Sequence, residues 1–195
     1  MVFSDRTYSV LVLSSSDKAN EMICGILPCG LFYPVTVIPT VGEAKRTVIE
    51  RFYDVIIINA PLPDEMGTDF ALDVCSKSDS GVLMLVKSEQ YEEISAAVCP
   101  YGVLTIAKPT SKQTLYQSVR LLCATRERIR KYEKTADTIE AKMEEIRLVN
   151  RAKWTLIEYL KMTEPEAHRF IEKQAMDMRI TKRAAAENIL RTYES

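Results

Sequence analysis

The sequence predicts an α/β fold, a doubly wound sheet of five parallel strands followed by a long helix and a small helical module. Three observations predict it. In the first 110 residues, short apolar runs alternate with helical patterns. From Ser111 onward there is no glycine and one proline, Pro165, in 85 residues, which is typical of helix. In this second part apolar residues recur in alternating steps of three and four.

The five predicted strands are short, continuously apolar and mostly rich in β-branched residues. Such strands are typical of a parallel sheet that is covered on both faces, and the ligand crevice of this flavodoxin-like arrangement lies at the carboxyl ends of the strands. The strands are expected at residues 9–13, 35–38, 55–58, 82–86 and 103–106. Helices are expected near residues 17–27, 42–52, 68–77 and 89–98.

The stretch 54–67, DVIIINAPLPDEMG, looks like the third strand and following loop of the receiver domain of response regulators. The resemblance places Asn59 where receivers carry the phosphate-accepting aspartate, and Lys108 matches the lysine after the fifth strand. An acidic pair that holds Mg²⁺ and a hydroxyl residue after the fourth strand are also expected, but this chain has Ser14, Ser15 and Val86 there.

These replacements predict a degenerate receiver that cannot be phosphorylated at the usual place. A carboxamide cannot form an acyl phosphate, and neutral hydroxyls are poor ligands for a hard dication. Asp17 or Asp64 could in principle hold a metal ion or accept the phosphate. Asp17 lies in the first turn of a helix and Asp64 in a loop, so both are equally plausible as an ordinary cap or turn residue. Lys108 could instead hydrogen-bond Asn59. A structural platform and a sensor of an unphosphorylated input both remain open readings of this domain.

The apolar repeat after Ser111 has the spacing of a coiled-coil seam, with charged residues between its members. One helix is expected from about 111 to 161, which exceeds the diameter of a small domain, so folding back on its own domain is disfavoured and a parallel homodimer is favoured. The seam comprises Ile129, Tyr132, Ala136, Ile139, Met143 and Ile146. The expected divisions are 1–118 for the pseudo-receiver domain, 119–146 for the coiled-coil linker helix and 147–195 for the C-terminal module.

The last 49 residues resemble an ANTAR domain, a three-helix RNA-binding module of bacterial transcription antiterminators. The resemblance rests on four segments: 147–157, which contains Arg-Ala-Lys, 160–171 with its Thr-Glu-x-Glu-Ala corner, 175–179 with Ala-Met-Asp-x-Arg, and 184–190. It implies that the protein binds paired stem-loops in a nascent transcript as a dimer and prevents a terminator hairpin from forming.

Helix signals agree with this module. Thr163 and Glu166 form a capping box with Pro165 in the first turn, and Thr181 is expected to cap the last helix. Trp154 is expected to pack rather than to stack on a base. The inward-facing residues are predicted to be Ala167, Phe170, Ile171, Gln174 and Met178, followed by Ala185, Ala186, Ile189, Leu190 and Tyr193.

Charge supports RNA binding by the module. Residues 147–195 contain ten Arg and Lys against seven Asp and Glu, a net charge of +3, which leaves −4 for the rest of the chain. Three of the cations surround the start of the last helix, whose backbone N–H groups also favour phosphate. The candidate RNA-binding residues are Arg179, Lys182, Arg183, Lys173, Arg169, Lys153 and Arg151.

Composition limits the other functions. The net charge of −1 gives no global attraction to nucleic acid, no stretch is apolar enough to span a membrane, and a cytoplasmic protein is expected. Five widely spaced cysteines and one histidine, His168, predict reduced, mostly buried thiols and neither a metal site nor a cofactor.

No nucleophile, base and orienting group fall together, so an enzyme is not expected. The alternative to an antiterminator is a dimeric protein-interaction scaffold that has lost RNA binding, and in either case a protein or small ligand could regulate the chain.

Overall fold

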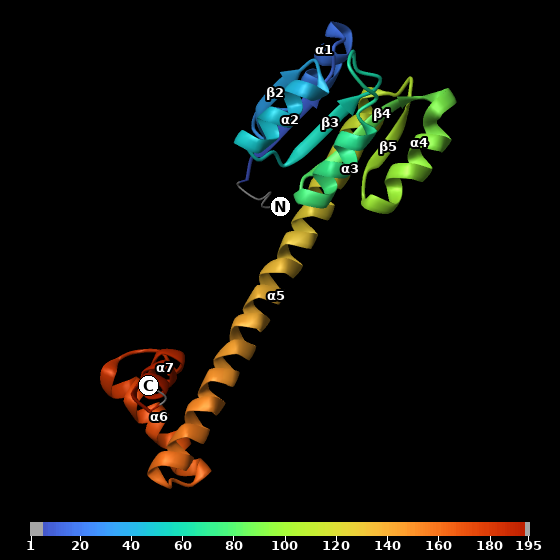
Figure 1. Cartoon of the computed structure of the whole chain (residues 1–195). Helices are drawn as coiled ribbons and strands as arrows, with labels where there is room; N and C mark the ends of the chain where they lie inside the picture. Colours follow the sequence, from blue (N-terminus) through green and yellow to red (C-terminus); the bar gives the residue numbers. More distant parts are fainter. Residues whose placement is uncertain (1–5, 194–195) are drawn as a thin grey trace. The chain divides into compact units, whose positions relative to one another are not determined.

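The computed structural model describes residues 6–193. These residues form two compact units, which divide between Ile129 and Arg130. The first unit contains the sheet, and the second is helical (Figure 1). The helix α5, Lys112–Leu160, runs without interruption from one unit into the other. The division of the chain at residues 118 and 146 therefore falls within a continuous helix and stays a prediction.

The sheet of the first unit has five parallel strands in the order β2-β1-β3-β4-β5. This is the predicted doubly wound arrangement, and the register of the pairs brings the carboxyl ends of the strands to one edge. The strands are β1 Tyr8–Leu13, β2 Phe32–Ile38, β3 Val55–Asn59, β4 Gly81–Lys87 and β5 Leu104–Lys108.

Helices cover both faces of the sheet because successive strand residues point to opposite sides. Leu11 and Leu13 pack in the layer with α2, α3 and α4, whereas Val10 and Val12 pack in the layer with α1 and the start of α5. The helices of this unit are α1 Asp17–Gly25, α2 Val41–Glu50, α3 Thr68–Lys77 and α4 Tyr91–Val98, with the short 3₁₀ turns η1 Ser88–Gln90 and η2 Cys99–Tyr101.

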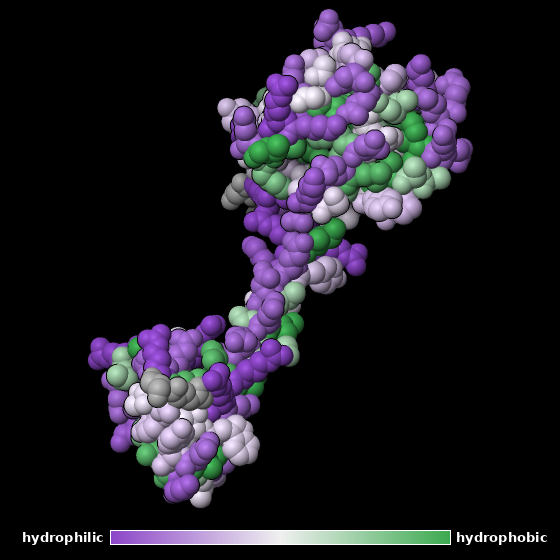
Figure 2. Space-filling view, viewed as in Figure 1, coloured by the Kyte–Doolittle hydropathy of each residue, from purple (hydrophilic) through white to green (hydrophobic). Residues whose placement is uncertain are grey.

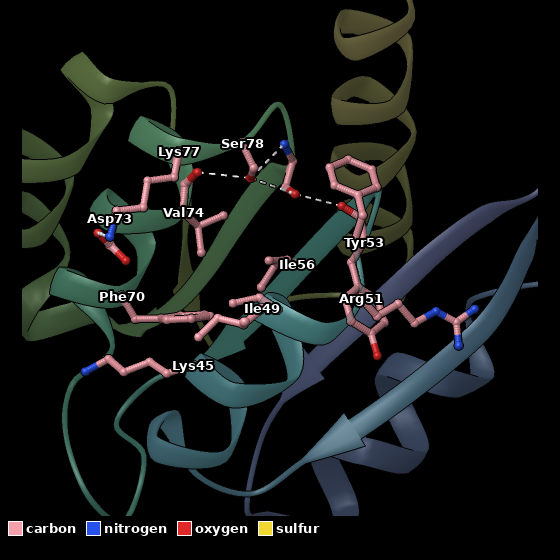
Figure 3. A pocket seen from close by; sticks show the side chains of 13 residues that line it. Lys45, Ile49, Arg51, Tyr53, Ile56, Phe70, Asp73, Val74, Lys77 and Ser78 are labelled. Carbon is pink, nitrogen blue, oxygen red and sulfur yellow. Dashed lines mark hydrogen bonds and ion pairs between the residues drawn. The ribbon is translucent and has the colours of Figure 1, made fainter.

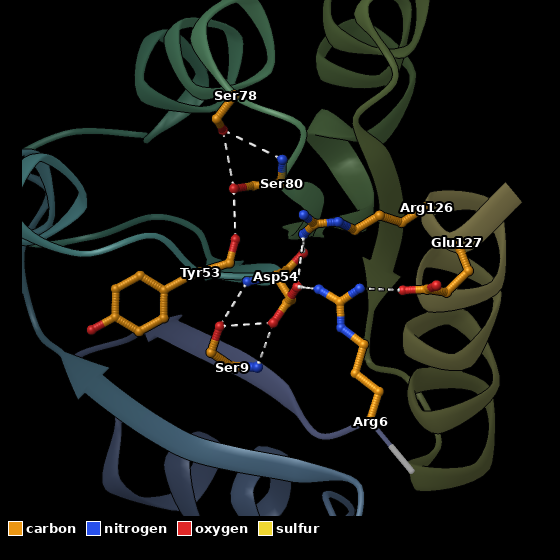
Figure 4. Close-up of polar contacts among 8 residues, drawn as sticks. All are labelled: Arg6, Ser9, Tyr53, Asp54, Ser78, Ser80, Arg126 and Glu127. Carbon is orange, nitrogen blue, oxygen red and sulfur yellow. Dashed lines mark hydrogen bonds and ion pairs between the residues drawn. The ribbon is translucent and has the colours of Figure 1, made fainter. Parts of the chain in front are cut away.

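A polar network at the amino end of β3 attaches α5 to the sheet (Figure 4). The carboxylate of Asp54 accepts hydrogen bonds from the backbone and hydroxyl of Ser9, at 2.9 Å each, and pairs with Arg6 at 2.9 Å and Arg126 at 3.2 Å. The guanidinium of Arg126 also donates to the Asp54 carbonyl oxygen at 2.9 Å, and Arg6 reaches Glu127 at 2.9 Å. Arg126 of α5 thus binds Asp54 directly, and Glu127 of α5 binds Arg6, which also binds Asp54.

The second unit packs the last turns of α5 against α6 Glu164–Met178 and α7 Lys182–Tyr193. The Glu166 carboxylate accepts hydrogen bonds from the N–H and hydroxyl of Thr163, at 2.8 Å each, and the hydroxyl of Thr181 caps α7. Its core consists of Ala152, Leu156, Ala167, Ile171, Ala175, Ala185, Ala186, Ile189 and Leu190.

The burial predicted for Met178 and for the cysteines is wrong. Met178, predicted to face inward, is 59% exposed, because the buried face of α6 follows steps of four through Ala167, Ile171 and Ala175. The cysteines are not mostly buried either. Only Cys123 is buried, whereas Cys29 and Cys99 are exposed on short turns outside the core; all five are free thiols. Within residues 6–193, no helix combines the length and apolarity that a membrane span needs.

We predict that Arg126→Ala lowers the free energy of unfolding of the first unit by about 2–3 kcal/mol. Arg126 is 9% exposed, and its loss removes one of two guanidinium partners of a buried carboxylate. Urea unfolding, followed by the fluorescence of a label in this unit, measures the change. Lys131→Ala removes the same charge one turn and a half further along α5, at an exposed position, and is the control. Equal stability of the two variants would contradict the structural role assigned to Arg126.

Candidate functional site

The residues that resemble a receiver's phosphorylation pocket meet at the carboxyl edge of the sheet. Asn59 ends β3, Ser14 directly follows β1, and Lys108 ends β5. The Asn59 amide donates to the Ser14 hydroxyl at 3.1 Å, and the Lys108 ammonium donates to the Asn59 side-chain carbonyl at 2.9 Å and to the Ala60 backbone carbonyl. Ser14 and Asn59 are buried. The pocket is therefore filled by its own side chains, which bond one another.

The other two positions do not join this network. Ser15 is exposed, and Val86 is fully buried in the layer beneath α2, α3 and α4. A hydroxyl does occur two residues beyond Val86, but Ser88 donates it to the backbone carbonyl of Lys108 at 2.6 Å. This hydroxyl was not anticipated from the sequence, because only the strand geometry places Ser88 beside the end of β5.

Asp64 and Asp17 have local structural roles. The Asp64 carboxylate accepts from the N–H groups of Gly42 at 2.9 Å and Val41 at 3.1 Å and so caps the start of α2. These backbone hydrogen bonds, that from Gly42 foremost, hold the pKa of Asp64 below its usual range. Asp17 is the first residue of α1, next to the capping hydroxyl of Ser16. Across residues 6–193, His, Cys, Asp and Glu form no group of three suited to a metal ion.

The Lys108 ammonium has only neutral partners. Burial lowers the pKa of Lys108 below its ordinary value, and repulsion by Lys87 lowers it further. Amide and peptide carbonyls accept its hydrogen bonds but bring no negative charge, unlike the carboxylate that the receiver family has at the position of Asn59. The pocket consequently carries an unbalanced positive charge without an acidic residue to bind Mg²⁺.

The predicted seam forms an exposed apolar stripe on α5. Its five large residues are 48–62% exposed, and apolar side chains appear at the surface of this stretch of helix in Figure 2. Half-exposed apolar side chains at regular helical spacing indicate a surface that another helix can cover. The residues are Ile129, Tyr132, Ile139, Met143 and Ile146.

Three of the seven candidate RNA-binding cations form ion pairs. Lys153 pairs with Glu164 at 2.7 Å and joins α5 to the start of α6, and Lys182 pairs with Glu172 at 2.6 Å and joins α7 to α6. Within α7, Arg183 pairs with Glu187 at 3.0 Å. The charges of these three cations are thus already paired within the module. The paired lysines lower the pKa values of Glu164 and Glu172.

Three others have no carboxylate within ion-pair distance in the described part of the chain. Arg169 and Lys173 lie one turn apart on the exposed side of α6, and Arg179 is exposed at the left-handed end of that helix. Arg151 is exposed on α5 and has contacts of its own. The sequence does not show which cations form ion pairs and which do not, because the packing of one helix against another decides which carboxylates lie within reach.

Trp154 is not packed, which corrects the expectation from the sequence. It is 70% exposed on α5, because Ala152, Thr155 and Leu156 occupy the side of the helix that faces α6 and α7. A large exposed indole on a basic module is a surface that can stack on a planar group.

Comparison with known proteins agrees with both parts of this description. Residues 137–190 match the family model of the ANTAR domain. The chain is 30% identical over 139 residues to the transcriptional regulatory protein PdtaR of Mycobacterium tuberculosis strain CDC 1551 / Oshkosh. The match covers 71% of this chain and 68% of the relative, and PdtaR of strain H37Rv matches equally.

Solved structures of receiver domains share the fold of the first unit. The signal receiver domain of an HD domain-containing protein from Pseudomonas fluorescens Pf-5 superimposes with a TM-score of 0.58 at 17% identity, covering 67% of this chain and 96% of that one. The chemotaxis response regulator CheY4 of Vibrio cholerae gives a TM-score of 0.53 at 21% identity, covering 60% and 99%. At these identities the likeness shows the fold alone.

We predict that Lys108 loses its proton at a lower pH than the exposed lysines, because burial disfavours its ammonium form. Asn59→Asp places a carboxylate at this ammonium and therefore raises the Lys108 pKa. NMR titration of the lysine side chains measures both, with Lys108→Arg to assign the signal. Asn59→Ala, which removes the acceptor and adds no charge, is the control and leaves the pKa low. An unchanged Lys108 pKa in Asn59→Asp would contradict the contact.

Proposed function

Because this chain belongs to the family of PdtaR-type ANTAR regulators, we propose that it is an RNA-binding transcription antiterminator that acts as a dimer and without phosphorylation. Its module binds paired stem-loops in a nascent transcript and keeps a terminator hairpin from forming. The observation that carries the proposal is the complete helical module at the end of the chain, with its net charge of +3.

The three cations that form no ion pair in the described structure are the first candidates for phosphate contacts. Arg169, Lys173 and Arg179 can approach a phosphate without first breaking an ion pair within the described structure, whereas Lys153, Lys182 and Arg183 must exchange a carboxylate for it. RNA of this kind is recognised at loop bases and the surrounding backbone. The exposed indole of Trp154 adds a surface on which an unpaired base can stack.

The stripe on α5 supports a homodimer. Continuing its steps of three and four beyond Ile146 reaches Asn150, which is exposed and would lie in the seam of two parallel helices. A single asparagine at such a position pairs with its copy and fixes the register of a two-stranded coiled coil. Two modules held in this way reach two stem-loops by effective concentration.

Independence from phosphorylation is supported by the filled pocket. The acceptor position is an amide already bonded to Ser14 and Lys108, the Mg²⁺-binding positions are serines, and Val86 has no hydroxyl. Dimerisation is then constitutive, or a protein or a small ligand controls it.

The rival is a dimeric interaction scaffold without RNA binding. The ion pairs of Lys153, Lys182 and Arg183 favour the scaffold, because these three charges are already paired with carboxylates of the module. The relatives' role as transcriptional regulators and the three cations that form no ion pair in the described structure favour the antiterminator, and neither reading assigns an enzymatic step to the chain.

We predict that the purified protein binds a two-hairpin leader RNA without any phosphodonor. Replacing Arg169, Lys173 and Arg179 together by alanine raises Kd at least about tenfold and reduces the slope of log K against log salt by about two, since three phosphate contacts are lost. Filter binding at several salt concentrations measures both quantities.

The matched control removes three exposed cations from the first unit, Lys18, Arg46 and Lys112, and leaves the slope unchanged. Acetyl phosphate with Mg²⁺ leaves the affinity of the wild type unchanged. Weak binding that is equal in wild type and variant would favour the scaffold, and tighter binding with acetyl phosphate would contradict phosphorylation independence.

We predict that Ile139→Asp converts the dimer to a monomer, because two carboxylates would face each other in the seam. Sedimentation velocity measures the mass. Thr138→Asp places the same charge one residue away and outside the seam, at an exposed position, and remains dimeric. A wild-type monomer, or two variants of equal mass, would refute the coiled-coil dimer.

A further inference from the structure

The first unit has a cavity at the opposite edge of the sheet from Asn59. It lies between α2 and α3, where β3 and β4 begin, and its volume is about 350 Å³ (Figure 3). This size is within the range of pockets that hold small organic ligands. The amino ends of parallel strands share one edge, so this cavity is separate from the receiver-like pocket at the carboxyl ends.

The floor of the cavity is apolar and formed by core residues. Ile56 of β3 and Phe70 and Val74 of α3 are buried, and each contributes to the main core of the sheet. At the mouth, Ile49 is 84% exposed and Phe52 is 49% exposed. An apolar surface therefore continues from the core out to solvent, where a bound molecule could cover it.

Each of the three cations around the cavity has a contact of its own. Lys45 pairs with Glu65 at 2.8 Å, Lys77 pairs with Asp73 at 2.5 Å, and the guanidinium of Arg51 lies 5.8 Å from the ring centre of Tyr53. Both lining ammonium groups are thus paired, and the Arg51 guanidinium points away from Ile56 and Phe70 in Figure 3. No unpaired charge faces the apolar floor, so an occupant without charge is favoured.

The polar groups of the wall are also satisfied. The hydroxyl of Ser78 bonds that of Ser80 at 3.0 Å, and Ser80 donates to the Tyr53 carbonyl at 2.7 Å. In the described residues, none of the cavity's side chains has a buried polar atom without a hydrogen-bond partner. An occupant needs little hydrogen bonding, and apolar contact is the main source of affinity.

We propose that this cavity binds a small, uncharged, predominantly apolar molecule of the size of one or two rings. The proposal does not depend on RNA binding. It identifies a place for a small-ligand input in a domain whose phosphorylation pocket is filled.

The cavity wall also contacts α5. A bound molecule could therefore affect the surroundings of a residue of that helix. The guanidinium carbon of Arg126 lies 4.7 Å from the ring centre of Phe52, and the same guanidinium binds Asp54. The Nε atom of Arg126 is buried and has no partner in the described structure. Movement of the Phe52 ring by a ligand therefore changes the surroundings of Arg126, and its Nε–H is a reporter of binding.

The test uses the full-length protein and two probes with one apolar body, 2-naphthol and its anionic counterpart 2-naphthoate, titrated at pH 7 by NMR. We expect saturable binding of one equivalent of 2-naphthol, with the largest shifts at the backbone amides of Ile49, Phe52 and Val74 and at the Arg126 Nε–H. We expect 2-naphthoate to bind about tenfold more weakly, because its carboxylate loses water at an apolar mouth.

Ile49→Asp tests the site directly, because an exposed position tolerates the change and the new carboxylate stands at the mouth. It weakens 2-naphthol binding about tenfold. Tyr101→Asp, which changes an exposed aromatic residue outside the cavity lining, leaves binding unchanged. Absence of saturable binding, or equal affinity in wild type and Ile49→Asp, would overturn the site. Binding of 2-naphthoate as tight as that of 2-naphthol would overturn the assignment to uncharged ligands.

Discussion

The helix α5 belongs to two hydrophobic cores, and both units depend on this sharing. Its first turns supply Leu115, Val119 and Cys123, which cover one face of the sheet, and its last turns supply Ala152 and Leu156 to the three-helix module. A continuous helix fixes the angular position of each residue about its axis at 100° per residue. The apolar stripe lies on the stretch of α5 between the residues of these two cores.

The Asp54 network holds α5 at the point where the helix leaves the sheet. A carboxylate held by two arginines and a serine is costly to bury unless every partner is in place, so the network specifies one position of α5 against β3. Phe52, which the Arg126 guanidinium covers, is also part of the mouth of the cavity between α2 and α3. The cavity and the helix are thus linked through one side chain, and the receiver-like pocket takes no part in that link.

At the receiver-like pocket, the chain keeps the geometry of a phosphorylation site and changes its chemistry. Asn59, Ser14 and Lys108 occupy the same edge of the sheet that a receiver uses, but an amide and a hydroxyl replace the carboxylates. An amide cannot form an acyl phosphate, and the three side chains satisfy each other's hydrogen bonds.

The sequence by itself determined the order of strands and helices, the long helix, the helix caps at Thr163 and Thr181, and the loss of the acceptor carboxylate at Asn59. These follow from local pattern and from residue identity, which need no knowledge of distant contacts. Only the tertiary structure decided that Trp154 is exposed, that Ala175 replaces Met178 in the core, and that Lys153 and Lys182 are paired while Arg169 and Lys173 are not. It alone also revealed the Arg126–Asp54 contact and the cavity beside Phe52. The reason is physical: burial and ion pairing depend on which helix faces which, and residues far apart in the chain set that geometry.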